Sequence, residues 1–93
     1  MLTNSSFLKA SNCLKTIAHP KRLKMIYMLL EKSRTVKELA EACKVRHNVA
    51  STHLTIMKDR NLVSSKKVNR EVIYSVKEKA LQNILKCIEN KFG

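Results

Sequence analysis

Apolar side chains recur at intervals of three and four residues along the first sixty positions of the chain, which is the period of an amphipathic helix. This pattern predicts four helices, over about residues 5–18, 21–32, 35–43 and 47–60. Pro20 separates the first two, because proline disfavours helical geometry in the residue before it and fits the first turn of a new helix. Thr35 and Glu38 have the spacing of a capping box, which predicts the start of the third helix.

Each predicted helix has one apolar face, which we expect to pack into a core. These faces are Phe7, Ala10, Leu14 and Ile17 in the first helix, Leu23, Ile26, Tyr27 and Leu30 in the second, Val36, Leu39, Ala40 and Cys43 in the third, and Ala50, Leu54 and Met57 in the fourth.

The pattern changes after Asn61, where LVSSKKV and EVIYSV form two short runs rich in β-branched residues. We expect a β-hairpin over residues 63–76, with Asn69 at the turn, because asparagine tolerates a positive φ. Residues 77–92 return to helical spacing. The predicted fold is therefore mainly α with a small β-hairpin, in the order α-α-α-α-β-β-α. That order is typical of a winged helix-turn-helix in a single domain of residues 1–93.

The charge of the chain indicates its class of partner. The 93 residues include 19 Lys and Arg against 7 Asp and Glu, a formal net charge of +12. So large an excess in a small domain favours a polyanion, most simply nucleic acid, although charge also serves solubility. Aromatic residues make up 4% of the chain and Trp is absent, which argues against a single-strand binder that works by base stacking. No apolar run approaches the length of a membrane span, and the N-terminus lacks the pattern of a secretory signal, so we expect a cytoplasmic protein.

The fourth predicted helix, over residues 47–60, has the composition of a helix that reads the major groove of double-stranded DNA. Apolar residues in RHNVASTHLT can pack behind it, and small or amide side chains can face the bases. Asn48 has the groups for a bidentate bond to adenine, whereas His53 is expected to flank the contact. The predicted DNA-binding residues are Arg46, His47, Asn48, Ser51, Thr52 and Thr55 on or beside this helix, Lys66, Lys67 and Arg70 on the wing, and Lys21 and Arg22 at the start of the second helix.

Three segments, LKTIAHPKRLKMIYMLL, TVKELAEACKVRHNVASTHLTIMKDRNLV and NREVIYSV, resemble the ArsR/SmtB family of bacterial transcriptional repressors. The resemblance covers about residues 14–76, in matching order and spacing. It implies a homodimer built on the first and last helices, binding to an inverted-repeat operator, and release by an effector. The dimer interface expected from it comprises Phe7, Leu14, Leu81, Ile84, Leu85 and Ile88.

Three positions depart from the family pattern, because Lys44, Asn61 and Asn69 stand where the family commonly has glycine. Asparagine tolerates a positive φ, so two of these changes are mild. Lys44 has no such tolerance, and we expect either strain or a different turn after the third helix.

Neither of the metal sites usual in the family is expected. TVKEL has no cysteine, and the last helix has no histidine or aspartate. His47 and His53 are six residues apart rather than four, which is the wrong spacing for a two-histidine metal face, and we place both on the groove side. Cys13 and Cys87, on the two expected dimerisation helices, form a candidate redox or thiophilic-ion site, with simple packing as the alternative.

The sequence gives no nucleophile and base pair, so an enzyme is not expected, and no cofactor is indicated. Two other classes compete with a sequence-specific regulator. One is an architectural protein that binds nucleic acid without sequence preference, and the other is a winged-helix module that docks a protein partner. A small-molecule, redox or metal effector is compatible with the sequence but is not indicated by it.

Overall fold

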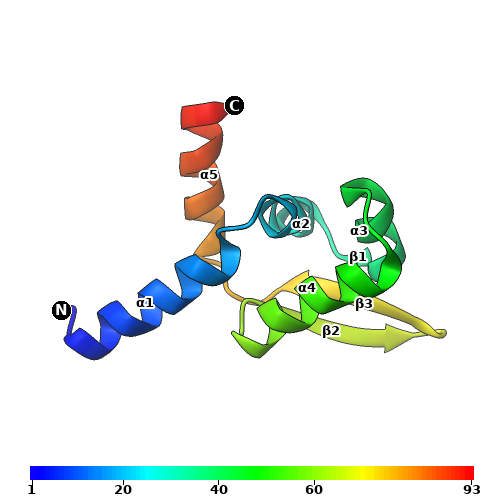
Figure 1. Ribbon diagram of the computed structural model, residues 1–93, viewed down its shortest axis with the longest axis horizontal. Helices are drawn as coiled ribbons and strands as arrows, with labels where there is room; N and C mark the ends of the chain where they lie inside the picture. Colours follow the sequence, from blue (N-terminus) through cyan, green and yellow to red (C-terminus); the bar gives the residue numbers. More distant parts are fainter.

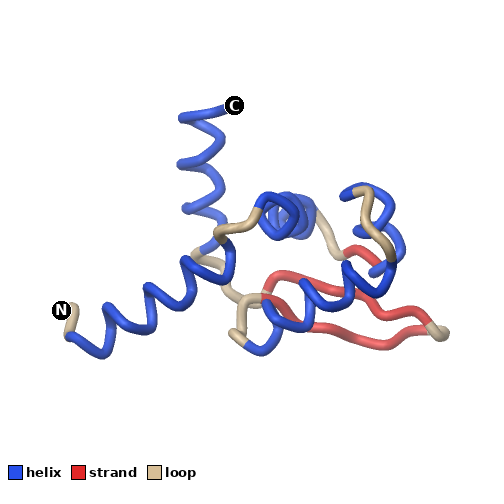
Figure 2. Tube along the Cα trace, in the orientation of Figure 1, coloured by secondary structure: helices blue, strands red, loops and turns tan.

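The computed structural model describes residues 1–93 and contains five helices around a small sheet (Figures 1 and 2). The elements in chain order are α1 (Asn4–Ile17), α2 (Pro20–Glu31), β1 (Arg34–Thr35), α3 (Val36–Cys43), α4 (His47–Asp59), β2 (Val63–Val68), β3 (Glu71–Val76) and α5 (Leu81–Phe92). The predicted class, mainly α with a winged helix-turn-helix, is confirmed.

The sheet differs from the prediction, because it has three strands rather than two. The strand order is β1-β3-β2, with both pairs antiparallel, so β3 is the central strand. Two residues of β1 add to the hairpin, with Arg34 opposite Tyr74 and Thr35 opposite Ile73. A two-residue strand has no alternation to detect, and its partner lies about forty positions away, so the sequence pattern could not reveal it.

Side-chain caps mark the starts of α2 and α3. The capping box at α3 is confirmed, since Thr35 Oγ1 accepts from the Glu38 backbone N–H at 3.0 Å and the Glu38 carboxylate accepts from the Thr35 N–H at 2.9 Å. His19 caps α2 in a less usual way, with its Nδ1 accepting from the Lys21 N–H at 3.1 Å and Pro20 in the first turn. The last helix is shorter than predicted, because the N–H groups of residues 77 and 78 both donate to the Leu62 carbonyl before α5 begins at Leu81.

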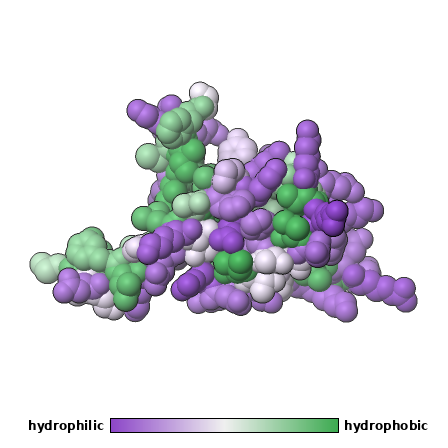
Figure 3. Space-filling view, viewed as in Figure 1, coloured by the Kyte–Doolittle hydropathy of each residue, from purple (hydrophilic) through white to green (hydrophobic).

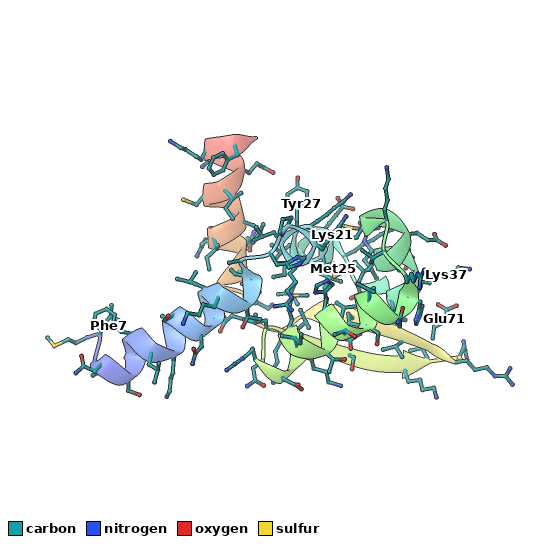
Figure 4. All side chains as sticks on the ribbon, viewed as in Figure 1. Phe7, Lys21, Met25, Tyr27, Lys37 and Glu71 are labelled. Atoms are coloured by element: carbon teal, nitrogen blue, oxygen red, sulfur yellow. The ribbon has the colours of Figure 1, made fainter.

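The core lies between α2, α3, α4 and the sheet, and α5 closes one end. The predicted core faces of α3 and α4 are confirmed, because all of their members are buried. The face predicted for α2 is partly wrong. Met25 and Leu29 are buried, while Tyr27 is 54% exposed. In Figure 4, Met25 points from α2 into the body and Tyr27 points the other way, where its hydroxyl donates to the Glu89 carboxylate of α5 at 3.0 Å.

Helices α1 and α5 project from this body as two arms (Figure 1). Only Thr16 and Ile17, in the last turn of α1, are buried. The predicted core residues Phe7 and Leu14 are 58% and 52% exposed in the single chain. Therefore α1 joins the body mainly through its C-terminal half, where Thr16 and Ile17 are buried and Cys13 packs against the core.

The backbone takes a positive φ at four non-glycine residues, Lys44, Asn61, Asn69 and Arg70. Lys44 has φ 55° and ψ 46°, the left-handed conformation, so the strained turn expected after the third helix is present. Asn69 and Arg70 both have positive φ, which matches the twist of a two-residue hairpin turn.

Candidate nucleic-acid interface

One face of α4 is anchored in the core and the opposite face is open to solvent. Ala50, Leu54 and Met57 are completely buried. Five of the residues predicted to contact DNA are exposed on α4 and its cap, namely Arg46, His47, Asn48, Thr52 and Thr55, while Ser51 is half-buried at the edge. Val49, Lys58 and Asp59 are also exposed on this helix. The Thr52 hydroxyl donates to the Asn48 carbonyl at 2.9 Å, and its oxygen remains able to accept a further hydrogen bond.

His53 does not lie on this face, so its expected position beside the groove is wrong. Its ring is half-buried and turned toward α2, where Nδ1 accepts from Arg22 Nε at 3.0 Å. The ring of His19 lies 4.6 Å away, centroid to centroid. Burial lowers the pKa of His53 below its ordinary value, and the nearby His19 and Arg22 lower it further. Position 53 faces inward because it lies three residues after Ala50 and four before Met57, which are both core residues on the same side of the helix.

The basic residues at the start of α2 have internal partners that the sequence did not predict. Lys21 Nζ donates to the Cys43 carbonyl at 2.7 Å, and Lys24 Nζ donates to the Ala42 carbonyl at 2.8 Å. Both cations therefore sit at the C-terminal end of α3, where free carbonyls and the helix dipole favour positive charge. Arg22 also donates from Nη1 to the Thr16 carbonyl at 2.9 Å.

The wing presents the remaining cations. Lys66, Lys67 and Arg70 are exposed on the hairpin, as predicted from its sequence. Lys58 Nζ donates to Ser65 Oγ at 2.7 Å, which ties α4 to β2 and keeps wing and helix in a fixed relation.

A hollow of about 240 Å³ separates the wing tip from the first turns of α3 and α4. Lys37, His47 and Arg70 line it together with Glu71. Figure 4 shows Lys37 and Glu71 on neighbouring elements at this end of the molecule. Sequence reasoning missed Lys37, although its place in the first turn after the Thr35 cap made its exposure predictable.

Ion pairing neutralises very little of the surface charge. A single salt bridge is present, between Arg34 and Glu31 at 2.6 Å. The other 18 of the 19 lysines and arginines have no acidic partner within 4.0 Å. Figure 3 shows hydrophilic side chains over most of the visible body, and hydrophobic ones along α1 and α5.

All three cysteines are free thiols in three different settings. Cys43 is buried in the core, as predicted, and burial raises its pKa. Cys13 is half-buried near the end of α1, where burial and then the charge of Glu78 raise its pKa. Cys87 is exposed on α5. No group of three or more His, Cys, Asp or Glu side chains converges on a point that could hold a metal ion.

The expected dimer contacts also need correction. Leu81 and Leu85 are 1% and 6% exposed, because they hold α5 to the core of their own chain. Ile84 and Ile88 are half-buried beside them, and Phe92 is 79% exposed.

No helix has the length and apolar character required to cross a membrane.

Comparison with known proteins gives consistent matches. Residues 19–65 match the family model described as bacterial regulatory protein, arsR family. The HTH-type transcriptional regulator YgaV of Escherichia coli is 31% identical over 85 residues, which cover 90% of this chain and 86% of that protein. The HTH-type transcriptional repressor SmtB of Mycobacterium tuberculosis is 33% identical over 76 residues, 82% of this chain and 56% of its own length. The crystal structure of NolR from Sinorhizobium fredii superposes with a TM-score of 0.86 at 25% identity, covering 100% of this chain and 96% of that one.

Proposed function

The chain belongs to the arsR family of bacterial regulatory proteins, and we propose that it represses transcription by binding an inverted-repeat DNA site as a homodimer. The observation that carries the proposal is the outer face of α4. It combines exposed amide, hydroxyl and basic side chains with a back face locked in the core. The family consists of transcriptional regulators with this winged-helix domain, and regulators of this kind are not enzymes.

In the proposed complex, α4 lies in the major groove and the β2–β3 hairpin lies on the adjacent backbone. Asn48 accepts from and donates to an adenine edge, and Ser51, Thr52 and Thr55 supply adaptable hydrogen bonds. Arg70, at the wing tip, would enter the minor groove. The phosphate contacts are supplied by Arg46, His47, Lys66 and Lys67, with Lys37 added from the hollow beside the wing.

Lys21 and Arg22 have a smaller part in this proposal than the sequence suggested. Lys21 would have to leave the Cys43 carbonyl to reach a phosphate, and Arg22 would have to leave two partners at once. We therefore assign both mainly to holding the domain together, with Lys21 at the edge of the DNA surface.

The proposed dimer interface comprises the exposed apolar residues of the two arms. On α1 these are Phe7, Leu8 and Leu14, all more than half exposed, and on α5 they are the partly open Ile84, Ile88 and Phe92. So many exposed apolar residues on two projecting helices indicate that a second copy of the chain covers them. A two-fold axis through the arms would place two α4 helices in successive major grooves, which is why we propose an inverted repeat.

Repression is proposed because the SmtB relative from Mycobacterium tuberculosis is a transcriptional repressor. In this mechanism the dimer occupies DNA that polymerase needs, so affinity and protein concentration set the level of transcription.

The test is fluorescence anisotropy with DNA from upstream of the protein's own gene and with a scrambled duplex. We expect preference for the natural sequence and a slope of log K against log salt of about −7, since about eight neutralised phosphates per dimer release their counterions. Asn48→Ala should reduce the preference, while Asn90→Ala, a matched exposed asparagine on α5, should not. Equal affinity for both duplexes would favour the architectural protein instead.

The dimer is tested by sedimentation. Leu14→Asp should give folded monomers, because Leu14 is 52% exposed in the single chain and contributes little to its core. Val72→Asp serves as the control, since Val72 is also exposed but lies on the wing. Retention of a dimer by the Leu14 variant would show that the interface lies elsewhere.

A further inference from the structure

Three side chains meet where the end of α1, the start of α2 and the middle of α4 come together. Arg22 of α2 donates from Nε to Nδ1 of His53 on α4 at 3.0 Å, and from Nη1 to the Thr16 carbonyl of α1 at 2.9 Å. His19 packs its ring 4.6 Å from that of His53. One guanidinium therefore connects the helix proposed to read DNA with the helix proposed to form the dimer.

Few other contacts hold α1 against the body. Thr16 and Ile17, in its last turn, are its only buried residues, and Cys13, about one turn earlier, packs against the core while remaining partly exposed. The Thr16 carbonyl that accepts from Arg22 belongs to the last turn. Since the two α4 helices of a dimer must match the spacing of two half-sites, the angle between α1 and α4 bears directly on specific binding.

The chemistry of the connection requires a neutral ring at position 53. Nδ1 accepts a hydrogen bond only when it carries no proton, so the proton of neutral His53 lies on Nε2. A proton added to Nδ1 removes the acceptor and places a second positive charge 3.0 Å from the Arg22 donor. Both effects separate α4 from Arg22.

No negatively charged group acts on His53 that would offset the repulsion between a protonated ring and Arg22. The charged or titratable groups acting on its ring are His19, at the cap of α2, and Arg22, also on α2. The facing group on α1 is the uncharged Thr16 backbone, and the neighbours along α4 are Thr52 and Leu54. Burial, His19 and Arg22 all lower the pKa of His53.

We propose that Arg22 and His53 are positioning residues that set the orientation of α4 relative to α1, and that protonation of His53 releases α4 and weakens specific DNA binding. This inference rests on the proposed role of α4 in reading DNA. It makes specific affinity dependent on pH through a residue that does not touch DNA.

The first part of the test measures the ratio of affinities for specific and scrambled DNA at pH 7.5 and pH 5.0, at constant salt. The ratio cancels the general gain in attraction that acidification brings to any basic protein. For the wild type we expect the ratio to fall by about fivefold or more, since one titrating group per subunit can change log K by up to one per pH unit. His53→Asn should give a flat ratio, because Asn Oδ1 stands in the place of Nδ1, accepts from Arg22, and does not titrate.

A second readout does not depend on DNA. The NMR signal of the Arg22 Nε–H group should be protected from exchange at pH 7.5, and should be lost at pH 5.0 in the wild type but kept in His53→Asn. Arg22→Lys retains the positive charge but lacks the guanidinium group, whose separate N–H donors reach both His53 and Thr16. This variant should therefore show a low ratio of specific to scrambled affinity at both pH values. Circular dichroism at pH 5.0 is the control that shows whether each variant is folded.

The outcomes separate the two proposals. A protected Arg22 signal at pH 5.0 in the wild type, or the same pH profile in wild type and His53→Asn, would overturn the inference. Loss of the signal with an unchanged affinity ratio would overturn the positioning role. If the wild type shows no preference for the natural DNA even at pH 7.5, the proposed function fails and the positioning role falls with it, whatever the signal does.

Discussion

Replacing Lys44 with glycine should stabilise the domain. Lys44 ends α3 in the left-handed conformation, with φ 55° and ψ 46°, and its N–H donates to the carbonyls of Ala40 and Glu41. A β-carbon in this conformation costs about 1–2 kcal/mol. Glycine removes that cost, but it increases the freedom of the unfolded chain, which costs about 0.4–1 kcal/mol. The difference lies between about 0 and 1.6 kcal/mol, so the central expectation for Lys44→Gly is a net gain of about 0.5–1 kcal/mol.

For a domain of this size, 1 kcal/mol shifts the Tm by about 4–8 °C, so we expect a rise of about 2–8 °C in thermal unfolding followed by circular dichroism. Protein concentration must be held fixed, because dimerisation makes the Tm depend on it. Lys32→Gly is the matched control, since Lys32 also ends a helix but has an extended backbone, with φ −166° and ψ 163°. Glycine there relieves nothing and should lower stability by about 0.5–1 kcal/mol. Equal destabilisation by both substitutions would refute the argument that Lys44 is strained.

Three further predictions concern capping, burial and pH. Thr35→Ala removes the oxygen that accepts from the Glu38 N–H, and should cost about 1 kcal/mol in urea unfolding; an unchanged midpoint would mean that the capping box is not stabilising. Leu85→Asp places a charge at a site only 6% exposed in the single chain, so we expect loss of helical circular dichroism at 25 °C, and a folded monomer would contradict its place in the core. Because the pKa of His53 is lowered in the folded state, its contribution to stability is fully present above its ordinary value of 6.5 and is lost as the pH falls through the folded pKa. The free energy of unfolding should therefore fall more steeply below pH 6.5 in the wild type than in His53→Asn.

The sequence predicted those parts of the fold that depend on local period and local chemistry. The apolar faces of α3 and α4, the Thr35 capping box and the turn at Asn69 all follow from residues within one helical turn or one hairpin. The matching order of segments in the arsR family fixed the topology in the same way. These features can be predicted from sequence because residues close together along the chain determine them.

What the sequence missed depends on contacts between distant residues. Arg22 and His53 are 31 positions apart, and nothing in either segment indicates that one holds the other. Periodicity identified the stripe on α5 but could not tell that Leu81 and Leu85 are covered by their own chain, whereas Phe92 is not. Tyr27 was misplaced for the same reason, because an aromatic ring with a hydroxyl fits either the core or a partly open site beside Glu89.

The short strand β1 has a consequence for how the domain opens. Thr35 pairs with Ile73 in the central strand of the wing, and the same residue caps the first turn of α3. The wing and the helix-turn-helix therefore share one residue and cannot separate without breaking both the strand pair and the cap. We expect them to behave as a single cooperative unit whose amide hydrogens exchange with one opening free energy, while α1 frays independently. Thermal motion then changes the angle at which this unit is held, and leaves intact the shape of the α4 surface that we propose reads DNA.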